Sequence, residues 1–304
     1  MTAVLDRAAP PVSPPRERRP ERTRRDAASR PSAMMSVNGL LIVGSAYMVL
    51  PLLWLVFAAT KTASGLFDGN PFQFGDAFVA NMTNLITTDD GLFLRWLLNS
   101  ILYAGIGAVV GGFISVMAGY AFDKFQFRAK PVLYGAVLLG VLIPHTATVI
   151  PLYLLAAASG MTNTIWAVII PSLCNPFSVY LARIFSAGYV PGEVLEAARV
   201  DGAGPIRTFL QVAMPMIAPG FVTIALFQFV SVWNNFMLPL IMLQNRELFP
   251  TSVGIFLWQS QAQQNPDFGT LVIAGSFLSV VPLLIAFIFL QRFWRAGLSA
   301  GSVK

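Results

Sequence analysis

Residues 191–220 read PGEVLEAARVDGAGPIRTFLQVAMPMIAPG and lie between two long apolar runs. The segment opens with Pro191-Gly192, which is a turn signal. Residues 193–200 then have the composition of a short helix, with Glu193 in the first turn, where the helix dipole favours an anion. Gly202 is suited to the left-handed conformation that ends many helices. The pattern therefore predicts a first short helix that ends at Asp201-Gly202.

A second helix is predicted directly after this turn. Pro205 fits the first turn of a helix, and the apolar residues that follow recur with helical spacing along one face: Ile206, Phe209, Leu210 and Ala213. Pro215 is expected to end this helix, and Pro219-Gly220 to mark the entry to the next apolar run. The segment is thus a helix–turn–helix. In its first helix, Ala197 and Ala198 leave a small, flat surface that the backbone of another protein could approach.

The composition around this segment is that of a membrane protein. The 304 residues are 56% hydrophobic and 11% charged, whereas an ordinary soluble domain is about 25% charged. Residues 1–30 contain 12 of the 34 charged side chains. Two long stretches have no charge between their ends, from Lys130 to Arg183 and from Arg207 to Arg246. These properties exclude a soluble enzyme and place the chain in a bilayer.

Six apolar segments are long enough to cross about 30 Å of hydrocarbon, which takes about 20 helical residues. They cover approximately 37–59, 96–122, 131–158, 164–185, 218–243 and 269–290. Backbone groups in lipid must be satisfied internally, so uninterrupted spans of this length indicate helices rather than barrel strands. The predicted fold class is therefore all-α, with six transmembrane helices.

The distribution of Lys and Arg predicts the orientation. If the N-terminus is cytoplasmic, the connections on the inside carry 17 Lys and Arg, and those on the outside carry three, namely Lys61, Arg95 and Arg246. Cytoplasmic loops are enriched in these residues. Both termini and the 191–220 segment are therefore expected in the cytoplasm. The external connections are then 60–95, a tight turn at 159–163, and a polar segment at 244–268 that contains a glutamine-rich run after Trp258.

Two predicted domains follow. Residues 1–35 form an Arg- and Pro-rich cytoplasmic tail, which is too polar to bury a core and is expected to be disordered. Residues 36–304 form the transmembrane domain. The basicity of the chain is therefore attributed to topology and to attraction to membrane lipid, and no nucleic-acid partner is expected. With Cys174 and His145 as the single residues of their kinds, a disulfide framework and a metal site are also not expected.

The helix–turn–helix carries a family resemblance. Its signal is a spaced pattern over 20 positions: Glu196, Ala197, Ala198, Gly202, Val212, Met214 and Pro215. This pattern resembles the EAA loop of ABC importer permeases, in which Ile and Leu usually stand where this chain has Val212 and Met214. The resemblance implies a six-helix type I importer permease fold.

Other stretches narrow the family that the chain resembles, and the resemblance covers roughly residues 37–304. They are Asn99-Ser100, the 120–130 loop, Ile143-Pro144, the Trp233-Asn234-Asn235-Phe236 run, and the C-terminal GLSAGSVK. Together they are similar to the second, maltose-type permease subunit of carbohydrate importers. One departure is that the family usually has an acid after the Trp-Asn pair, where this chain has Asn235. Any role for a carboxylate at that position is therefore in doubt.

The resemblance implies a mechanism and a set of partners. The sequence has no Gly-x4-Gly-Lys-Ser/Thr loop, so the chain is expected to bind no cofactor itself and to be no enzyme. ATP and Mg would be used by a partner ATPase dimer, beside a sister permease and an extracytoplasmic solute-binding protein, in the inner membrane of a prokaryote. The 193–215 loop would dock in the ATPase through Glu193, Glu196, Ala197, Ala198, Asp201, Gly202 and Pro215. The external segment 244–268 resembles one that reaches toward the binding protein.

Polar side chains within the predicted spans are candidates for the transport pathway, because such groups usually face the interior of a helix bundle. They are Asn99, Asn175, Gln228, Asn234 and Asn235, with Trp233 as an aromatic surface for a sugar ring. Each amide also fits a plain structural role in hydrogen bonds between helices.

Three alternatives to a sugar importer remain open at this point. The EAA-like loop alone also fits a permease for a glycerol phosphate or a polyamine, although the terminal and span-five motifs favour sugars. An ion or solute channel would not need that loop. A membrane-embedded enzyme would need ionisable groups within the spans, and His145 is essentially the only one there.

Overall fold

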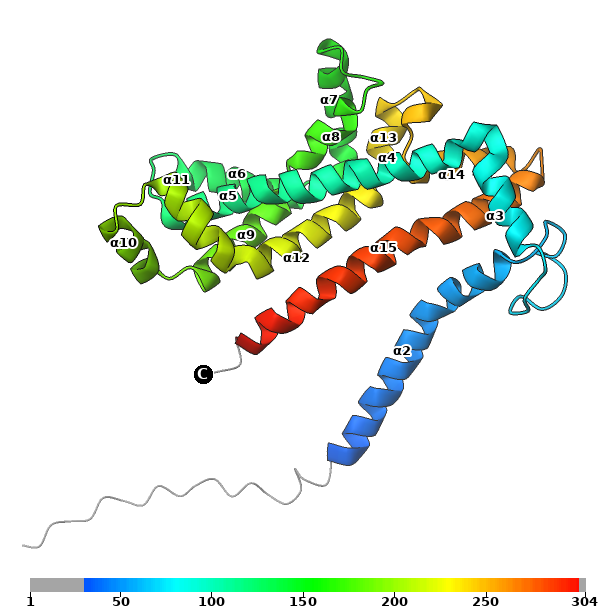
Figure 1. The fold of residues 1–304 in the computed structure, drawn as a ribbon, viewed down its shortest axis with the longest axis horizontal. Helices are drawn as coiled ribbons and strands as arrows, with labels where there is room; N and C mark the ends of the chain where they lie inside the picture. The colour runs from blue at the N-terminus through cyan, green and yellow to red at the C-terminus, as the bar shows by residue number, and fades with distance from the viewer. Residues whose placement is uncertain (1–29, 301–304) are drawn as a thin grey trace, which may run out of the picture. The chain divides into compact units, whose positions relative to one another are not determined.

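The computed structural model describes the backbone of residues 30–300 and the side chains of residues 34–289. Every element in that part of the chain is helical (Figure 1), which confirms the predicted all-α class. Residues 1–29 of the predicted tail lie outside the described residues. The first helix, α2 (Arg30–Ala58), begins at Arg30. The chain divides into two compact units, 1–52 and 53–304, which are described separately.

In the first unit, α2 is strongly apolar along its length. Its residues Met34–Ala58 have a mean hydropathy of 2.3, and none of the side chains in the most apolar window is buried. At 1.5 Å per residue the 25 residues span about 38 Å, enough to cross a bilayer. This helix corresponds to the first predicted span.

In the second unit, the second span is a long helix. It consists of α4 (Leu92–Ile106), a π-helical turn η2 (Gly107–Gly111) and α5 (Gly112–Lys124). The region predicted as a plain external connection at 60–95 also contains α3 (Phe78–Thr87) and a short 3-10 element, η1 (Thr88–Gly91). That prediction was wrong in this respect, because α3 buries Asn81 and Leu85.

The third and fourth predicted spans are both interrupted. Residues 131–158 do not form one straight span: α6 (Lys130–Leu142) and α7 (His145–Ala158) meet at an angle of 112°. Pro144 follows Ile143, which is extended with ψ 124, as expected for a residue before proline. The fourth span consists of α8 (Trp166–Leu173) and α9 (Pro176–Tyr189), with the break at Cys174 and Asn175.

The predicted cytoplasmic segment consists of α10 (Gly192–Val200), α11 (Pro205–Thr208) and the π-helical turn η3 (Phe209–Ala213). It continues into α12 (Met214–Trp233) without a stop. The predicted helix end at Pro215 was therefore wrong, and 205–233 form one helix of 29 residues. The proline is tolerated because it lies in the first turn of α12, after a π turn that has already replaced the regular i-to-i−4 pairing.

The predicted fifth span at 218–243 was also wrong in its bounds, because the helix ends at Trp233 and a short α13 (Met237–Met242) follows. Beyond it lie η4 (Arg246–Leu248), α14 (Thr251–Gln261) and α15 (Asp267–Ala300). The predicted polar connection at 244–268 thus contains a helix, and Trp258 within it is fully buried. Among the described residues, five helices are long and apolar enough to span a membrane, or six if the bent α6–α7 pair is one span.

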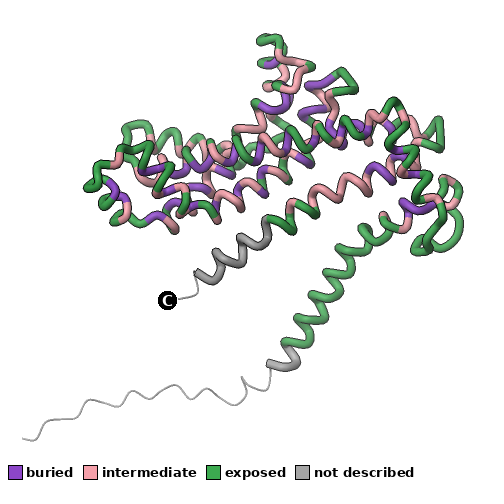
Figure 2. Tube along the Cα trace, in the orientation of Figure 1, coloured by how far each residue is buried: buried purple, intermediate pink, exposed green. Residues whose placement is uncertain are grey.

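Burial in the second unit is concentrated along the long helices (Figure 2). One apolar cluster joins α4, α14 and α15 around Phe93, Trp96 and Trp258. Another joins α5, α9 and the cytoplasmic segment around Val116, Ala182 and other side chains. The contact between α5 and α9 is very close at Gly119, where a Cβ would lie 2.5 Å from the Cβ of Ala182 and 2.6 Å from the backbone nitrogen of Arg183.

We expect Gly119→Ala to destabilise the protein by about 1–3 kcal/mol, because the added methyl group would force α5 and α9 apart. Gly105→Ala is the matched control in the same long helix, since a Cβ there meets nothing within 4 Å. That control should stabilise the protein by about 0.5–1 kcal/mol through the helix preference of alanine. The measurement is the thermal unfolding midpoint in detergent, and equal midpoints for the two variants would contradict the close packing.

Candidate functional site

The three helix breaks of the second unit meet at one cavity of about 700 Å³. Its wall includes residues from both sides of each break: Ile143 and His145 at the α6–α7 bend, Cys174 and Asn175 between α8 and α9, and Asn234, Asn235 and Phe236 between α12 and α13. Non-helical backbone at membrane depth is tolerated only where it is buried in protein or lines a water-filled cavity. A hydrated cavity is therefore the physical reason that three breaks can coincide.

Amide side chains complete the helix ends at this cavity. The Oδ1 of Asn175 accepts a hydrogen bond of 3.1 Å from the backbone N–H of Ser178 and so caps α9. Asn235 Oδ1 accepts one of 3.3 Å from the N–H of Leu238 in α13. Such caps satisfy N–H groups that have no partner within the helix. Both residues therefore have a structural role as well as a place on the cavity wall.

Gln228 connects three helices beside the cavity. It is 1% exposed, and its Oε1 accepts a hydrogen bond of 2.8 Å from the hydroxyl of Ser178 in α9. Its Nε2 donates one of 2.8 Å to the carbonyl oxygen of Ser172 in α8. A Cβ at Gly111 would lie 2.5 Å from this Nε2, so the glycine makes room for the amide. The hydrogen-bonding role between helices, which the sequence left as an alternative, is confirmed for this residue.

Four of the six predicted pathway residues line the cavity, namely Asn175, Gln228, Asn234 and Asn235. Trp233 does not: it is 5% exposed and stacks on Phe229 with ring centroids 5.6 Å apart. Asn99 does not line the cavity either, because its side chain donates hydrogen bonds to the backbone of the segment 244–251. Sequence reasoning did not select the lining residues Thr146 and Ser231. The only feature that could have pointed to these two residues is their position beside a helix break.

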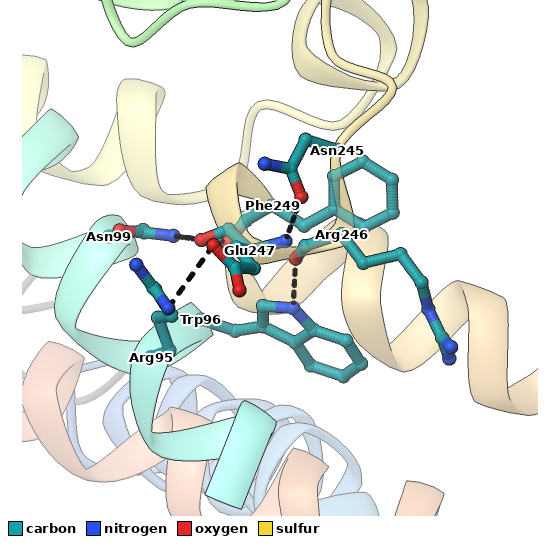
Figure 3. Close-up of polar contacts among 7 residues, drawn as sticks. All are labelled: Arg95, Trp96, Asn99, Asn245, Arg246, Glu247 and Phe249. Carbon is teal, nitrogen blue, oxygen red and sulfur yellow. Dashed lines mark hydrogen bonds and ion pairs between the residues drawn. The ribbon is translucent and has the colours of Figure 1, made fainter. Parts of the chain in front are cut away.

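At the end of the bundle predicted to be external, one face of α4 holds the backbone of the segment 244–251 (Figure 3). The Nε1 of Trp96 donates a hydrogen bond of 2.7 Å to the carbonyl oxygen of Arg246. The Nδ2 of Asn99 donates to the carbonyl oxygens of Glu247 at 2.7 Å and Phe249 at 3.0 Å. These two side chains are three positions apart and therefore share a helix face.

The same face of α4 continues one turn further. The hydroxyl of Tyr103 donates to the carbonyl oxygen of Leu248 at 2.8 Å, and Ser100 Oγ accepts from the N–H of Thr251 at 2.8 Å. Two ion pairs also join the segment to its surroundings, Arg95–Glu247 at 3.3 Å and Arg246–Asp89 at 3.5 Å. Their side chains are 38–57% exposed, so they add little. The hydrogen bonds from α4 hold this segment.

At the end of the bundle predicted to be cytoplasmic, α10 ends with the left-handed cap predicted for Gly202, which has φ +77. The N–H of Gly202 donates to the carbonyl oxygen of Arg199, and the N–H of Ala203 to that of Ala198. This pair of bonds is the Schellman motif. It satisfies the last carbonyl groups of α10 and turns the chain toward α11.

One face of α10 is anchored and the other is open. Leu195 is 6% exposed and packs in the cluster with Tyr120 and Phe209. Ala198 is 8% exposed, so the predicted flat surface of two alanines was wrong and only Ala197 faces outward. The open face carries three residues at helical spacing with Ala197: Glu193, Glu196 and Val200.

The predicted apolar face of the second helix is divided between inside and outside. Phe209 and Ala213 are buried, whereas Ile206 is 77% exposed and Leu210 48% exposed. The buried pair anchors the helix in the cluster around α5 and α9. The exposed pair adds apolar surface beside α10, outside the bundle. A surface of this kind is suited to contact with another protein.

The base of this segment is fixed by polar contacts with the end of α5. Lys124 Nζ donates to the carbonyl oxygen of Val190 at 2.6 Å and pairs with Asp123 Oδ2 at 2.8 Å. Asp123 Oδ2 also accepts from the hydroxyl of Ser186 at 2.7 Å. These contacts join the end of α9, which directly precedes α10, to the end of α5. Among the described residues, no three His, Cys, Asp or Glu side chains lie together in a way that could hold a metal ion.

Comparison with known proteins agrees with this architecture. The family model of the binding-protein-dependent transport system inner membrane component matches residues 111–296. The arabinooligosaccharides transport system permease protein AraQ of Halalkalibacterium halodurans is 31% identical over 88% of this chain and 97% of its own length. The lactose transport system permease protein LacG of Rhizobium radiobacter is 29% identical over 84% of this chain and 91% of its own length.

A solved bacterial ABC transporter involved in alginate import contains a chain that superposes with a TM-score of 0.74. It is 22% identical and covers 86% of this chain and 96% of its own length, so it supports the fold alone. The family match covers more than half of the chain and includes the cavity, the cytoplasmic segment and the external segment 244–251. The chain belongs to the inner membrane components of binding-protein-dependent transport systems and is a multi-pass permease subunit.

Proposed function

We propose that this chain, together with a sister permease, forms the pathway for uptake of a mono- or oligosaccharide by alternating access. The observation that carries the proposal is the chemistry of the cavity wall, which includes amides, hydroxyls, one imidazole and the ring of Phe236. No Asp, Glu, Lys or Arg is among the residues that line it. A neutral wall with many hydrogen-bonding groups suits a neutral polyhydroxyl solute, and an aromatic ring provides an apolar surface.

The same wall argues against the two alternative solutes. A glycerol phosphate would be recognised through cations, and a polyamine through carboxylates, and the lining residues offer neither. The names of the curated relatives point the same way, because they are transport permeases for arabinooligosaccharides and lactose.

We expect Ser231→Trp to abolish sugar uptake in the reconstituted transporter, because the indole would fill part of the cavity that this serine lines. Uptake of labelled mono- and oligosaccharides, of glycerol phosphate and of a polyamine should be compared in proteoliposomes with loaded binding proteins. Only the sugars should be taken up by the unaltered protein.

Val230→Trp is the matched control, since Val230 is the preceding residue of α12, is 37% exposed and does not line the cavity. It should retain uptake within about twofold. Equal loss in the two variants would show that the bulk of the indole, and not the cavity, causes the effect. Transport of the polyamine or the glycerol phosphate by the unaltered protein would exclude the proposed sugar specificity.

The energy for transport would come from a partner ATPase dimer that uses ATP and Mg and docks on the open face of α10. The residues assigned to this contact are Glu193, Glu196, Ala197, Asp201 and Gly202, with Ile206 and Leu210 as added apolar surface. Three acids and two exposed apolar side chains fit a partner cleft with basic and apolar walls. A channel would have no use for such a surface. Ala198 and Pro215 would act indirectly, by anchoring α10 and by beginning α12.

We expect Gly202→Val to lower the number of solute molecules taken up per ATP hydrolysed, because a β-branched residue is strained at φ +77. The strain would open the cap that sets the angle between α10 and α11. Gly204→Val is the matched control, since Gly204 has φ −69 and open space for a Cβ. The measurement is uptake and ATPase activity in proteoliposomes. Unchanged coupling in Gly202→Val, with both proteins present in the membrane, would refute the role of the cap.

The solute-binding protein would contact the external segment 244–251 and the exposed glutamines that follow α14. The hydrogen bonds from α4 support this proposal, because they present the segment as a fixed surface. Trp258 does not belong to this surface, since it is buried beside Phe93 and Trp96. Replacement of the whole 258–265 stretch would therefore damage the core and would not test docking.

We expect Asn99→Ala to release the external segment and to increase trypsin cleavage after Arg246, because two backbone carbonyl groups lose their donor. Affinity for the loaded binding protein should fall in parallel. Asn84→Ala, at an exposed position of α3, is the control and should leave both unchanged. If cleavage rises while binding-protein affinity is unaltered, the segment does not contact that partner.

A further inference from the structure

Three cations without an ion-pair partner lie at the end of the bundle that the Lys and Arg bias places in the cytoplasm. They are Arg128, Lys130 and Arg183, and we call them the basic rim. The ion pairs within residues 34–289 involve Arg95, Lys124 and Arg246, and none includes a member of the rim. The rim therefore keeps three positive charges available.

A group of aromatic rings brings the rim together from three elements. The Arg183 guanidinium of α9 lies 4.1 Å from the ring centroid of Tyr134 in α6. The Tyr134 ring is 5.4 Å from that of Phe122 in α5, which is 6.0 Å from that of Phe127. Arg128 directly follows Phe127. Lys130 precedes Tyr134 by four residues of α6, and residues so spaced share a helix face.

The depth of the rim matches the headgroup region of a membrane. Arg183 is six residues before the end of α9 at Tyr189, which is about 9 Å along the helix. Its neighbours on the outer surfaces of α6 and α9 are apolar: Val132 is 75% exposed and Ile184 48%. A long cationic side chain in such surroundings extends its charge to the interface while its stem stays in hydrocarbon.

The protein supplies little negative charge to this place. Asp123 at the end of α5 is the nearby acid, and its Oδ2 is already engaged with Lys124 at 2.8 Å and with the hydroxyl of Ser186 at 2.7 Å. Lys130 Nζ donates to the carbonyl oxygen of Phe125 at 2.9 Å, which leaves further N–H groups on the ammonium. The uncompensated charge at a lipid-facing surface calls for an anionic ligand from outside the chain.

We propose that the basic rim binds the phosphate of an anionic phospholipid in the cytoplasmic leaflet. The guanidinium groups of Arg128 and Arg183 would donate to the phosphate oxygens, and the acyl chains would lie along the apolar outer face of α6. Basic pockets between transmembrane helices on the cytoplasmic side are known to hold such headgroups. No residue of α6 is buried within this chain, so this face is open to lipid. The site is independent of the solute carried.

The test measures lipid retention by the full chain in detergent, using native mass spectrometry with phosphatidylglycerol and phosphatidylcholine. The unaltered protein should retain the anionic lipid preferentially. The double variant Arg128→Gln/Arg183→Gln should bind it roughly 25-fold more weakly, since each basic group near an anionic membrane contributes about a fivefold factor. Arg207→Gln is the control, because it removes one exposed cytoplasmic charge outside the rim. It should retain the lipid as the unaltered chain does.

Arg183→Lys separates loss of the site from loss of the fold, because it keeps the charge and should retain binding within about threefold. Equal retention of the two lipids by the unaltered chain, or full retention by the double variant, would overturn the proposal. Displacement of the lipid by an equal concentration of soluble glycerol phosphate would also overturn it, since the acyl chains would then contribute nothing. If the sister permease covers the basic rim in the assembled transporter and no lipid is retained there, the proposal is also overturned.

Discussion

The hydrocarbon interior of a membrane leaves backbone N–H and C=O groups no solvent partner, and this constraint determines where the helices of this chain can break. The breaks at Pro144, at Asn175 and at Asn234–Asn235 come from separate parts of the sequence, yet all three line the same cavity. A single break facing lipid would cost several kcal/mol. Breaks that share one hydrated space avoid that cost, so the space and the breaks require one another.

The amides near the cavity show how far a polar residue in a span can be interpreted. Sequence reasoning selected Asn175, Gln228 and Asn235 because buried polar groups need partners. The structure gives each of them a protein partner, as a helix cap or as a bridge between α8, α9 and α12. An amide can therefore lie on the cavity wall and still have a hydrogen-bond partner within the protein. Asn175 and Asn235 each use the Oδ1 atom in this way, and their amide nitrogens are available to the cavity. Both polar atoms of Gln228 are paired within the protein.

The prolines show what the sequence could not decide. Pro144 and Pro176 follow residues in extended conformation and stand at helix breaks, whereas Pro151 and Pro171 lie inside α7 and α8. Neighbouring helices can satisfy the group that a proline frees, so proline alone does not determine a break. Asn175 was a usable signal, because asparagine before proline fits a helix start. The spans and the Gly202 cap depend on local composition and were predicted, whereas which of the four prolines breaks its helix depends on packing.

The continuation of the helix through Pro215 changes how the two ends of the protein can communicate. A helix that stopped there would leave a joint between the cytoplasmic segment and the span. Residues 205–233 instead form one helix of 29 residues, about 44 Å long. It begins beside the Gly202 cap and ends at Asn234 and Asn235 on the cavity wall. Because one continuous helix reaches both sites, a tilt of α11 would move the cavity wall without a chain of separate side-chain rearrangements.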